Sequence, residues 1–398
     1  MKQQKTVCFL ADQHVLYDDR IYWKQALSLV KAGYRVHYIT IGDEEGRGTT
    51  NEGIHFLQLK RKKYVPTVVL NYLFKRIPFV PTEYDEAVAY CKQISVDVYH
   101  IHDPRINRIF KKLKAIHPKA KFIYDGREPI DKNLKDYRFK DSALPKSFTN
   151  RYADYIQQWE YNQVKNYDYI FTVDDGLYKR FKKNVPNVPI ENIYNFTNLK
   201  HQRESLSYDD KVYDAAYVGG LSVIRGALVA VKATKYVVEQ FPNYKLLLLG
   251  QIYDEQLQID MDNFIAEHHL QEHIVLKPFV PHQEVSTYFN RIKIGLNPLL
   301  YAKSHEEIIQ IKLFEYMNFG IPIITSDFGY MKQYVEENNV GVAIRPNDEK
   351  LLAYAIMDLL SHRAQFDLYA ENGIKAVDEK YNWDLMEKKM IDIYQNLW

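Results

Sequence analysis

Residues 6–41 of the chain read TVCFLADQHVLYDDRIYWKQALSLVKAGYRVHYITI, and this stretch decides the fold class. The apolar run at 6–11 is typical of a buried strand, and a polar loop at 12–19 follows it. Apolar residues then recur at helical spacing up to Gly33, which is expected to end the helix. Residues 35–41 form the next apolar run. This order of strand, loop, helix and strand predicts a parallel sheet with right-handed crossovers.

The same alternation recurs along both halves of the chain. Further strands are expected at 96–102, 120–124, 169–173, 192–195, 214–218, 245–249, 274–276, 294–296, 321–325 and 341–344. We therefore expect an α/β protein with two doubly wound, Rossmann-like domains at 1–200 and 201–380. A last helix at 381–398 is expected to pack back towards the N-terminal domain. Because doubly wound sheets bind ligands at the carboxyl ends of their strands, we expect the chemistry in a cleft between the domains.

Composition limits the class of protein. The 398 residues are 46% hydrophobic and 26% charged, and no apolar run approaches the roughly 18 residues that a membrane-spanning helix needs. Two cysteines, Cys8 and Cys91, cannot form a disulfide framework, and no signal-peptide pattern precedes the first strand. These features predict a multidomain globular protein of the cytoplasm.

The formal charge of +2 hides an asymmetry between the two halves. Residues 1–200 hold 34 Lys and Arg against 23 Asp and Glu, whereas residues 201–398 hold 19 against 28. The positive excess predicts an anionic partner for the first half, but nucleic acid is not expected because no nucleic-acid-binding motif is present. Residues 60–76 place cations on either side of an apolar stretch too short to span a bilayer. This segment fits either a core helix with basic flanks or peripheral docking on an anionic membrane surface.

The strongest local signal is residues 307–324, which read EIIQIKLFEYMNFGIPII. On a helix, Lys312 and Glu315 lie on one face. Tyr316 and Phe319 share this face, which we expect to be polar, while the buried face lies opposite. A lysine in the first turn of a helix suits a phosphate, since the unpaired amides point the same way, and a carboxylate one turn later can bind a sugar diol. The alternative is a surface Lys–Glu pair, which stabilises a helix by about 0.3–0.5 kcal/mol.

This stretch, E-x7-E followed by Y-M-x-x-G-x-P-I-I, resembles the signature of glycosyltransferase family 4. Residues 217–226, YVGGLSVIRG, are similar to the glycine loop and basic helix start of that family. The likeness covers about residues 5–397 and includes weaker matches at 18–36, 100–103, 124–128, 248–250, 275–281 and 341–346. It implies the GT-B fold, with two Rossmann-like domains facing across a cleft. It also implies transfer of a sugar from a nucleotide-diphosphate donor without a metal or other cofactor.

The resemblance assigns roles to individual residues of the donor site. Arg225 and Lys312 match the basic pair on the donor diphosphate, where they offset charge on the leaving group. Glu307 matches the carboxylate that faces the donor sugar, with adjacent Glu306 leaving the register open by one residue. The expected nucleotide-binding set is Glu315 on the ribose, main-chain groups of Phe279 and Val280 near the base, and Gly220 and Ile311.

The acceptor-side candidates come from the first half of the chain: Asp19, Arg20, His102, Asp103, Arg127 and Glu128. Many members of the family carry a histidine where this chain has Arg127. A permanent cation at this position indicates altered acceptor chemistry or a negatively charged acceptor.

Two other patterns resemble metal sites. His100 and His102 alternate along a strand and precede Asp103, but no further cluster with ligand spacing is visible, so we interpret them as strand-end histidines. The D-x-D pattern at 260–262 lies in a polar helical stretch and is interpreted as a solvated face. No metal ligand is therefore assigned.

Together these features predict a metal-independent glycosyltransferase of the hexosyltransferase type, and the resemblance implies that it retains the configuration of the transferred sugar. Its expected partners are a nucleotide-sugar donor, a glycan, polyanionic or lipid-linked acceptor of a cell-surface polysaccharide or glycoconjugate, and an anionic membrane surface. Two alternatives stay open. A nucleotide-sugar epimerase on the same fold would release an isomerised sugar without an acceptor, and a non-catalytic subunit would bind nucleotide sugars or glycans without turnover.

Overall fold

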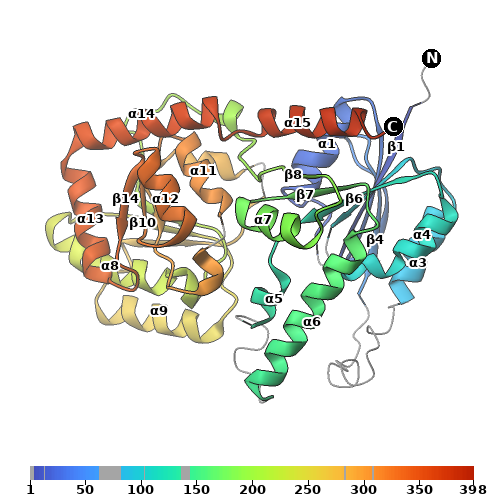
Figure 1. Ribbon diagram of the computed structural model, residues 1–398. Coiled ribbons are helices and arrows are strands. Elements are labelled where there is room, and N and C mark those ends of the chain that lie inside the picture. The colour runs from blue at the N-terminus through green and yellow to red at the C-terminus, as the bar shows by residue number, and fades with distance from the viewer. Residues whose placement is uncertain are drawn as a thin grey trace. The chain divides into compact units, whose positions relative to one another are not determined.

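The strands form two separate sheets in the computed structural model (Figure 1). The structure describes residues 4–12, 14–61, 82–102, 104–135, 144–281, 284–306 and 309–398. The amino-terminal unit comprises Met1–Asn195 with Met386–Trp398, and the carboxyl-terminal unit comprises Phe196–Leu385. Each sheet is flanked by helices, as expected for a doubly wound α/β fold (Figure 1).

The amino-terminal unit holds an eight-stranded sheet with the order β3-β4-β2-β1-β5-β6-β7-β8. Its strands are β1 (Thr6–Asp12), β2 (Arg35–Gly42), β3 (Gly46–Thr49), β4 (His55–Lys60), β5 (Val98–His102), β6 (Lys121–Gly126), β7 (Tyr169–Thr172) and β8 (Ile190–Asn192). Neighbouring strands are parallel except β3, which is antiparallel to β4. The sequence order reverses between β1 and β5, so the loops after these two strands meet at a topological switch point.

The helices of this unit connect the strands. They are η1 (Ile21–Ala26, a π-helical turn), α1 (Leu27–Lys31), α3 (Thr82–Cys91), η2 (Pro104–Ile109, a 3₁₀ helix), α4 (Phe110–Ile116), α5 (Ile130–Asn133), α6 (Lys146–Val164) and α7 (Asp175–Asn184). The final helix, α15, runs over Trp383–Gln395. Within the amino-terminal unit its Tyr394 hydroxyl lies 2.6 Å from Nδ1 of His100, and its Lys389 pairs with Glu191 at 2.7 Å.

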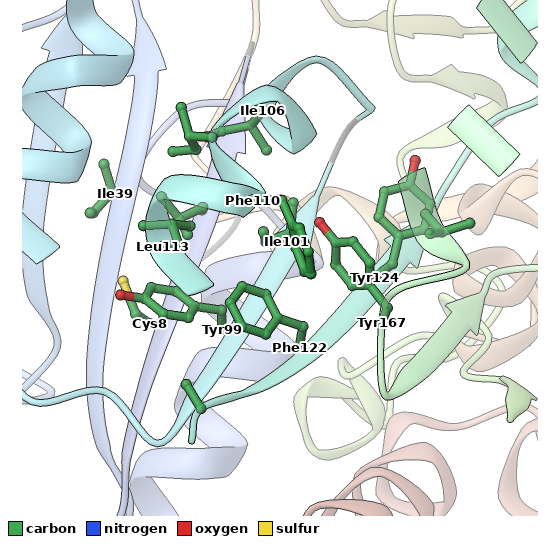
Figure 2. Packing of buried hydrophobic residues seen from close by; sticks show 14 of the residues in the cluster. Cys8, Ile39, Tyr99, Ile101, Ile106, Phe110, Leu113, Phe122, Tyr124 and Tyr167 are labelled. Carbon is green, nitrogen blue, oxygen red and sulfur yellow. The ribbon is translucent and has the colours of Figure 1, made fainter. Parts of the chain in front are cut away.

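Apolar residues of the strands and of the crossover helices build the core of the amino-terminal unit. Figure 2 shows Phe110 and Leu113 of α4 lying against residues of β5 and β6. The ring of Phe110 is 4.6 Å from that of Phe122 and 5.0 Å from that of Tyr167, measured between centroids. This aromatic packing fixes α4, and with it the end of η2, on one face of the sheet.

The carboxyl-terminal unit holds a six-stranded sheet with the order β11-β10-β9-β12-β13-β14, in which all neighbours are parallel. Its strands are β9 (Tyr213–Val218), β10 (Leu246–Leu249), β11 (Ile274–Lys277), β12 (Ile292–Asn297), β13 (Ile323–Ser326) and β14 (Gly341–Ile344). The order reverses between β9 and β12, which places the switch point of this sheet at the loops after those strands.

The carboxyl-terminal unit surrounds its sheet with α-helices and short 3₁₀ turns. They are η4 (Lys200–Gln202), η5 (Val223–Arg225), α8 (Ala227–Gln240), α9 (Glu255–Glu267), α10 (Val285–Phe289), η6 (Lys303–Glu306), α11 (Ile311–Asn318), α12 (Gly329–Glu337), α13 (Glu349–Ser361) and α14 (Arg363–Glu379). Helices α8, α9 and α13 supply buried residues to one core cluster with β9 and β10. The prediction of two doubly wound Rossmann-like sheets is confirmed.

One pair of strands was not predicted, and one predicted segment lies mostly outside the described residues. The antiparallel pair β3 and β4 was not expected, because β3 consists of the polar, glycine-rich residues GRGT and has no apolar run. The basic and apolar segment at 60–76 falls mostly outside the described residues, so membrane docking through it stays a prediction. Among the helices that the structure describes, none is long and apolar enough to cross a bilayer.

Gly295 of β12 lets α11 lie directly on the sheet. A Cβ atom at this position would be 2.6 Å from the ring of Tyr316, whose buried hydroxyl donates to the carbonyl of Ala216 and accepts from the amide of Val218, each at 3.1 Å. We expect Gly295→Ala to destabilise the protein by about 1–3 kcal/mol through overpacking. Urea unfolding measures this loss. In the control Gly42→Ala the new Cβ meets its nearest atom at 3.7 Å, so a similar loss in both variants would contradict the explanation.

Candidate functional site

The loops after β9, β10 and β12 meet at the carboxyl edge of the second sheet. Gly219 has a φ of +124° and Gly250 a φ of +152°, and a Cβ on Gly250 would lie 2.0 Å from the Gly219 carbonyl oxygen. Gly226, with a φ of +76°, starts α8, and a Cβ there would lie 1.9 Å from the carbonyl oxygen of Pro298. These contacts require glycine, because L side chains rarely adopt such angles and no space exists for a Cβ. They hold the main chain at the site in one arrangement.

Lys312 lies in the first turn of α11, which begins at Ile311. Its side chain is 6% exposed, its Nζ lies 3.5 Å from the ring centroid of Tyr217, and no described residue accepts a hydrogen bond from it. Burial and the nearby charge of Arg225 hold the pKa of Lys312 well below its usual range. A buried cation at a helix amino terminus is unfavourable by itself, because the helix dipole is positive there. The arrangement is therefore suited to an anion.

Arg225 and Gly220 lie beside this lysine. The exposed Arg225 guanidinium donates to the carbonyl of Gly220 at 3.2 Å, and a Cβ on Gly219 would approach Nζ of Lys312 to 3.4 Å. The Tyr217 hydroxyl donates to the same Gly220 carbonyl at 3.3 Å, and burial raises the pKa of Tyr217 to about 12. The structure thus brings Gly220, Arg225 and Lys312 together as the sequence indicated.

One expectation about α11 is wrong. The face that carries Lys312, Tyr316 and Phe319 was expected to be polar and exposed, but all three side chains are buried. The reason is that α11 is covered on more than one side: Tyr316 lies on the sheet, and the Phe319 ring stacks on Phe289 of α10 at 5.2 Å. On this face only Glu315 is partly exposed. A simple surface Lys–Glu pair therefore does not describe the helix.

The remaining donor-site candidates lie around the same edge. Ile311 is half-buried at the start of α11. The charge of Glu315 raises the pKa of Lys312 and so opposes part of the lowering by burial and Arg225. Phe279 and Val280 follow β11, with Phe279 exposed. Glu307 lies outside the described residues. Its neighbour Glu306 accepts a hydrogen bond from the Tyr301 hydroxyl at 2.7 Å.

A buried ion pair organises the corresponding edge of the amino-terminal unit. Arg20 and Asp125 are both fully buried, and the guanidinium donates to the carboxylate through Nε at 3.1 Å and through its terminal nitrogen at 2.8 Å. Gln25 donates to the same carboxylate at 2.6 Å, and Arg20 also donates to the carbonyl of Ile193 at 2.8 Å. Although burial by itself raises it, the pKa of Asp125 is held well below its usual range by Arg20 and His100. This network ties the start of η1 to the ends of β6 and β8.

His100, His102 and Asp125 form the one group of potential metal ligands found among the described residues, with ligand atoms within 4.8 Å of one another. The two imidazoles stack with centroids 4.7 Å apart, and burial lowers the pKa of each. The Asp125 carboxylate is already bonded to Arg20 and Gln25, so a cation would compete with a fixed guanidinium. We interpret this group as two buried, neutral histidines packed beside the Arg20–Asp125 ion pair.

Of the acceptor-side candidates, Arg127 and Glu128 lie on a cavity of about 690 Å³, whereas Arg20 and His102 are buried beneath the surface. Arg127 pairs with Asp18 at 3.4 Å and contacts the ring of His14 at 3.1 Å. Burial alone would raise the pKa of Asp18, but Arg127 and His14 hold it well below its usual range. Asp19 accepts from Lys24 at 2.7 Å, and Asp103 lies outside the described residues.

Sequence reasoning missed several residues that shape these sites. Tyr217, whose ring contacts the Lys312 ammonium, lies within residues 217–226. No sequence pattern predicts this contact. Asp125 lies within the segment 124–128, but its partner Arg20 is separated from it by 105 residues. The cavity residues Arg105 and Arg108 follow β5 and carry no motif. Pairing across such distances becomes visible only in the folded chain.

Two parallel α/β sheets, each with its functional residues at the carboxyl edge, define the class of GT-B glycosyltransferases. Solved structures agree with this fold. Sucrose-phosphate synthase from Thermosynechococcus elongatus matches with a TM-score of 0.71 at 17% identity, covering 99% of each chain. Anabaena HepE in complex with UDP and glucose also matches with a TM-score of 0.71, at 10% identity, covering 98% of this chain and all of HepE.

The sequence comparisons agree with the structural ones. Residues 199–376 match the family described as Glycosyl transferases group 1. An uncharacterized glycosyltransferase, MJ1607 of Methanocaldococcus jannaschii, is 21% identical over 385 residues, which are 93% of this chain and 92% of the relative. The family match covers residues 199–376, and together with the fold these findings support a group 1 glycosyltransferase that uses a nucleotide-sugar donor.

Removal of one member of the buried Arg20–Asp125 pair tests the network. We expect Arg20→Met to lower the free energy of unfolding by about 3–5 kcal/mol, because Asp125 then stays buried without its main countercharge. The double variant Arg20→Met/Asp125→Asn should lose less than the single variant, since it removes the unpaired charge. Urea unfolding of the three proteins measures both values. A loss below about 1 kcal/mol for Arg20→Met would contradict the central place of this pair.

Proposed function

We propose that this protein is a retaining glycosyltransferase of the hexosyltransferase type, which moves a sugar from a nucleotide-diphosphate donor to a glycan or lipid-linked acceptor. The carboxyl-terminal unit binds the donor and the amino-terminal unit binds the acceptor. The supporting observation is the buried Lys312 ammonium, which lies at the amino terminus of α11 and beside Arg225 without an accepting group among the described residues.

The donor diphosphate lies against Lys312, Arg225 and the first amides of α11 in this proposal. The guanidinium of Arg225, the ammonium of Lys312 and the helix amino terminus stabilise negative charge as it develops on the leaving nucleoside diphosphate. Because Lys312 is fixed by burial and Arg225 by its hydrogen bond to the Gly220 carbonyl, these groups need little rearrangement at the moment of bond breaking. HepE, which shares the fold, has been solved with UDP and glucose, and this supports UDP as the first nucleotide to test.

Glu315 and Glu307 are assigned to the two sugar rings of the donor. Glu315 is partly exposed on α11, one turn after Lys312, and its carboxylate is suited to the ribose hydroxyls. Glu307, from the signature, is assigned to the hydroxyls of the transferred sugar. Main-chain groups near Phe279 and Val280, after β11, are assigned to the base. The expected absence of a bound metal follows from this set, because the cations that offset the diphosphate belong to the protein.

Loss of the basic pair tests the donor assignment. We expect Lys312→Met and Arg225→Gln each to lower turnover by about two to three orders of magnitude, because each removes a group that stabilises charge in the transition state. Initial rates of donor consumption, with UDP-sugars and a mixture of acceptor glycans, measure the effect. The control is Lys350→Met, which removes an exposed lysine at the start of α13. Equal rates in Lys312→Met and this control would refute the assignment.

The same assay separates transfer from the other chemistry that the fold supports. A transferase consumes the donor only when an acceptor is present and releases the nucleoside diphosphate. Release of an isomerised sugar without any acceptor would instead identify an epimerase.

A further inference from the structure

A cavity of about 690 Å³ opens in the amino-terminal unit at the switch point between β1 and β5. Asp12 at the end of β1 and His14 just after it line the cavity, and Arg105 and Arg108 reach it from η2, which follows β5. The opposite wall comes from α6, the long green helix of Figure 1. The volume and position are those of a small-molecule site in an α/β sheet.

Arg105 and Arg108 point to the same side of η2, because side chains three residues apart eclipse one another on a 3₁₀ helix. No described residue forms an ion pair with either, and the Nε of Arg108 is buried without a hydrogen-bond partner. Burial, helped by the charge of Arg105, lowers the pKa of Arg108, yet a guanidinium stays charged at neutral pH. Two neighbouring cations that form no ion pair with a described residue favour a ligand that carries more than one negative oxygen.

The carboxylates that line the cavity offset this charge only in part, through Asp12, which favours the charged form of Arg108 without forming an ion pair with it. Asp12 is 1% exposed and is already bonded to Arg61 and to the Tyr84 hydroxyl. Burial raises the pKa of Glu160 to about 7, so near neutral pH this group is about half protonated. Glu128 is exposed and accepts from Asn133. A negative ligand therefore meets Arg105 and Arg108 with their donors available.

The wall opposite the two arginines is largely apolar. Trp159, Ile156 and Tyr152 of α6 line it, and the guanidinium of Arg108 lies 5.8 Å from the Trp159 ring centroid. Burial of an alkyl or aromatic group against such a wall removes apolar surface from water and so favours binding. A purely polar glycan would leave this wall unused.

We propose that this cavity binds an organic phosphate, with its phosphate on Arg105 and Arg108 and its apolar part along Trp159 and Ile156. The proposal rests on the proposed glycosyl transfer, of which this ligand is the acceptor or the anchoring part of the acceptor. A phosphate monoester matches two guanidinium groups better than a carboxylate does, because it presents three oxygens and up to two charges. The apolar wall favours a lipid-type phosphate over a soluble sugar phosphate.

Binding of simple probes tests the proposal without a known acceptor. We expect octyl phosphate to bind the full-length protein at least tenfold more tightly than glycerol phosphate, and octyl glucoside, which lacks the phosphate, not to bind at the same concentrations. In Arg105→Gln/Arg108→Gln the affinity for octyl phosphate should fall at least tenfold. The control Arg35→Gln/Lys119→Gln removes two cations at the opposite, amino-terminal edge of the sheet and should keep full affinity. Arg105→Glu alters one exposed side chain, so its loss of binding cannot come from a disrupted core.

The outcomes separate this proposal from the donor assignment. UDP binding should persist in Arg105→Gln/Arg108→Gln and be lost in Lys312→Met, while octyl phosphate binding should show the reverse. Octyl phosphate binding that is unchanged in the double variant, or is lost equally in the Arg35→Gln/Lys119→Gln control, would overturn the site. Equal affinity for glycerol phosphate and octyl phosphate would overturn the apolar part of the assignment. If UDP fails to bind while octyl phosphate binds as expected, the donor assignment fails and this one stands.

Discussion

The burial of one ammonium group explains most of the architecture of the carboxyl-terminal unit. Lys312 lies inside the protein, on the ring of Tyr217 and at the positive end of α11, where neither the helix dipole nor Arg225 favours its charge. Such a position is stable in its charged form only when an anion joins it. The absence of a Cβ at Gly295 lets Tyr316 hold α11 against the sheet, and the glycines after β9 and β10 keep the loop close to Nζ. The local features of this edge thus hold one buried cation beside Arg225 and the amino terminus of α11, as the proposed diphosphate site requires.

Much of the fold could be predicted because apolar runs and glycine stops are local signals. Gly33, with a φ of +89°, follows the helix that it was expected to end. Gly320, with a φ of +59°, lies just after α11 in the same way. The hairpin of β3 and β4 could not be predicted in this way, since an edge strand such as GRGT is stabilised by its neighbour and carries no apolar pattern. Burial of the second face of α11 was missed for a related reason, because Phe289 covers it from a separate helix.

The site was predictable only where chemistry follows a motif. Gly220, Arg225 and Lys312 lie together as the resemblance implied, since their spacing is fixed by two strand-to-helix turns at one sheet edge. The Arg20–Asp125 pair and the cavity arginines depend on contacts between distant parts of the chain. The positive excess of the first half predicts an anionic partner, and the site we propose for it is the cavity of Arg105 and Arg108, which form no ion pair with a described carboxylate. Some other basic residues of this half form ion pairs near the surface, such as Lys121 with Asp168.

Proton uptake on nucleotide binding tests the central claim most directly. In the free protein burial and Arg225 lower the pKa of Lys312, whereas a bound diphosphate favours the ammonium and raises that pKa. At a pH between the pKa of Lys312 in the free protein and its pKa in the complex, the complex holds more protons than the free protein and free UDP do together. The affinity for UDP therefore falls as the pH rises through this range. Calorimetry of UDP binding between about pH 7 and 9, in buffers of different ionisation enthalpy, counts these protons, and above the second phosphate pKa of about 6 the nucleotide itself contributes little. The account predicts net proton uptake in the wild type and none in Lys312→Met. Binding without uptake, or the same uptake in both proteins, would contradict it.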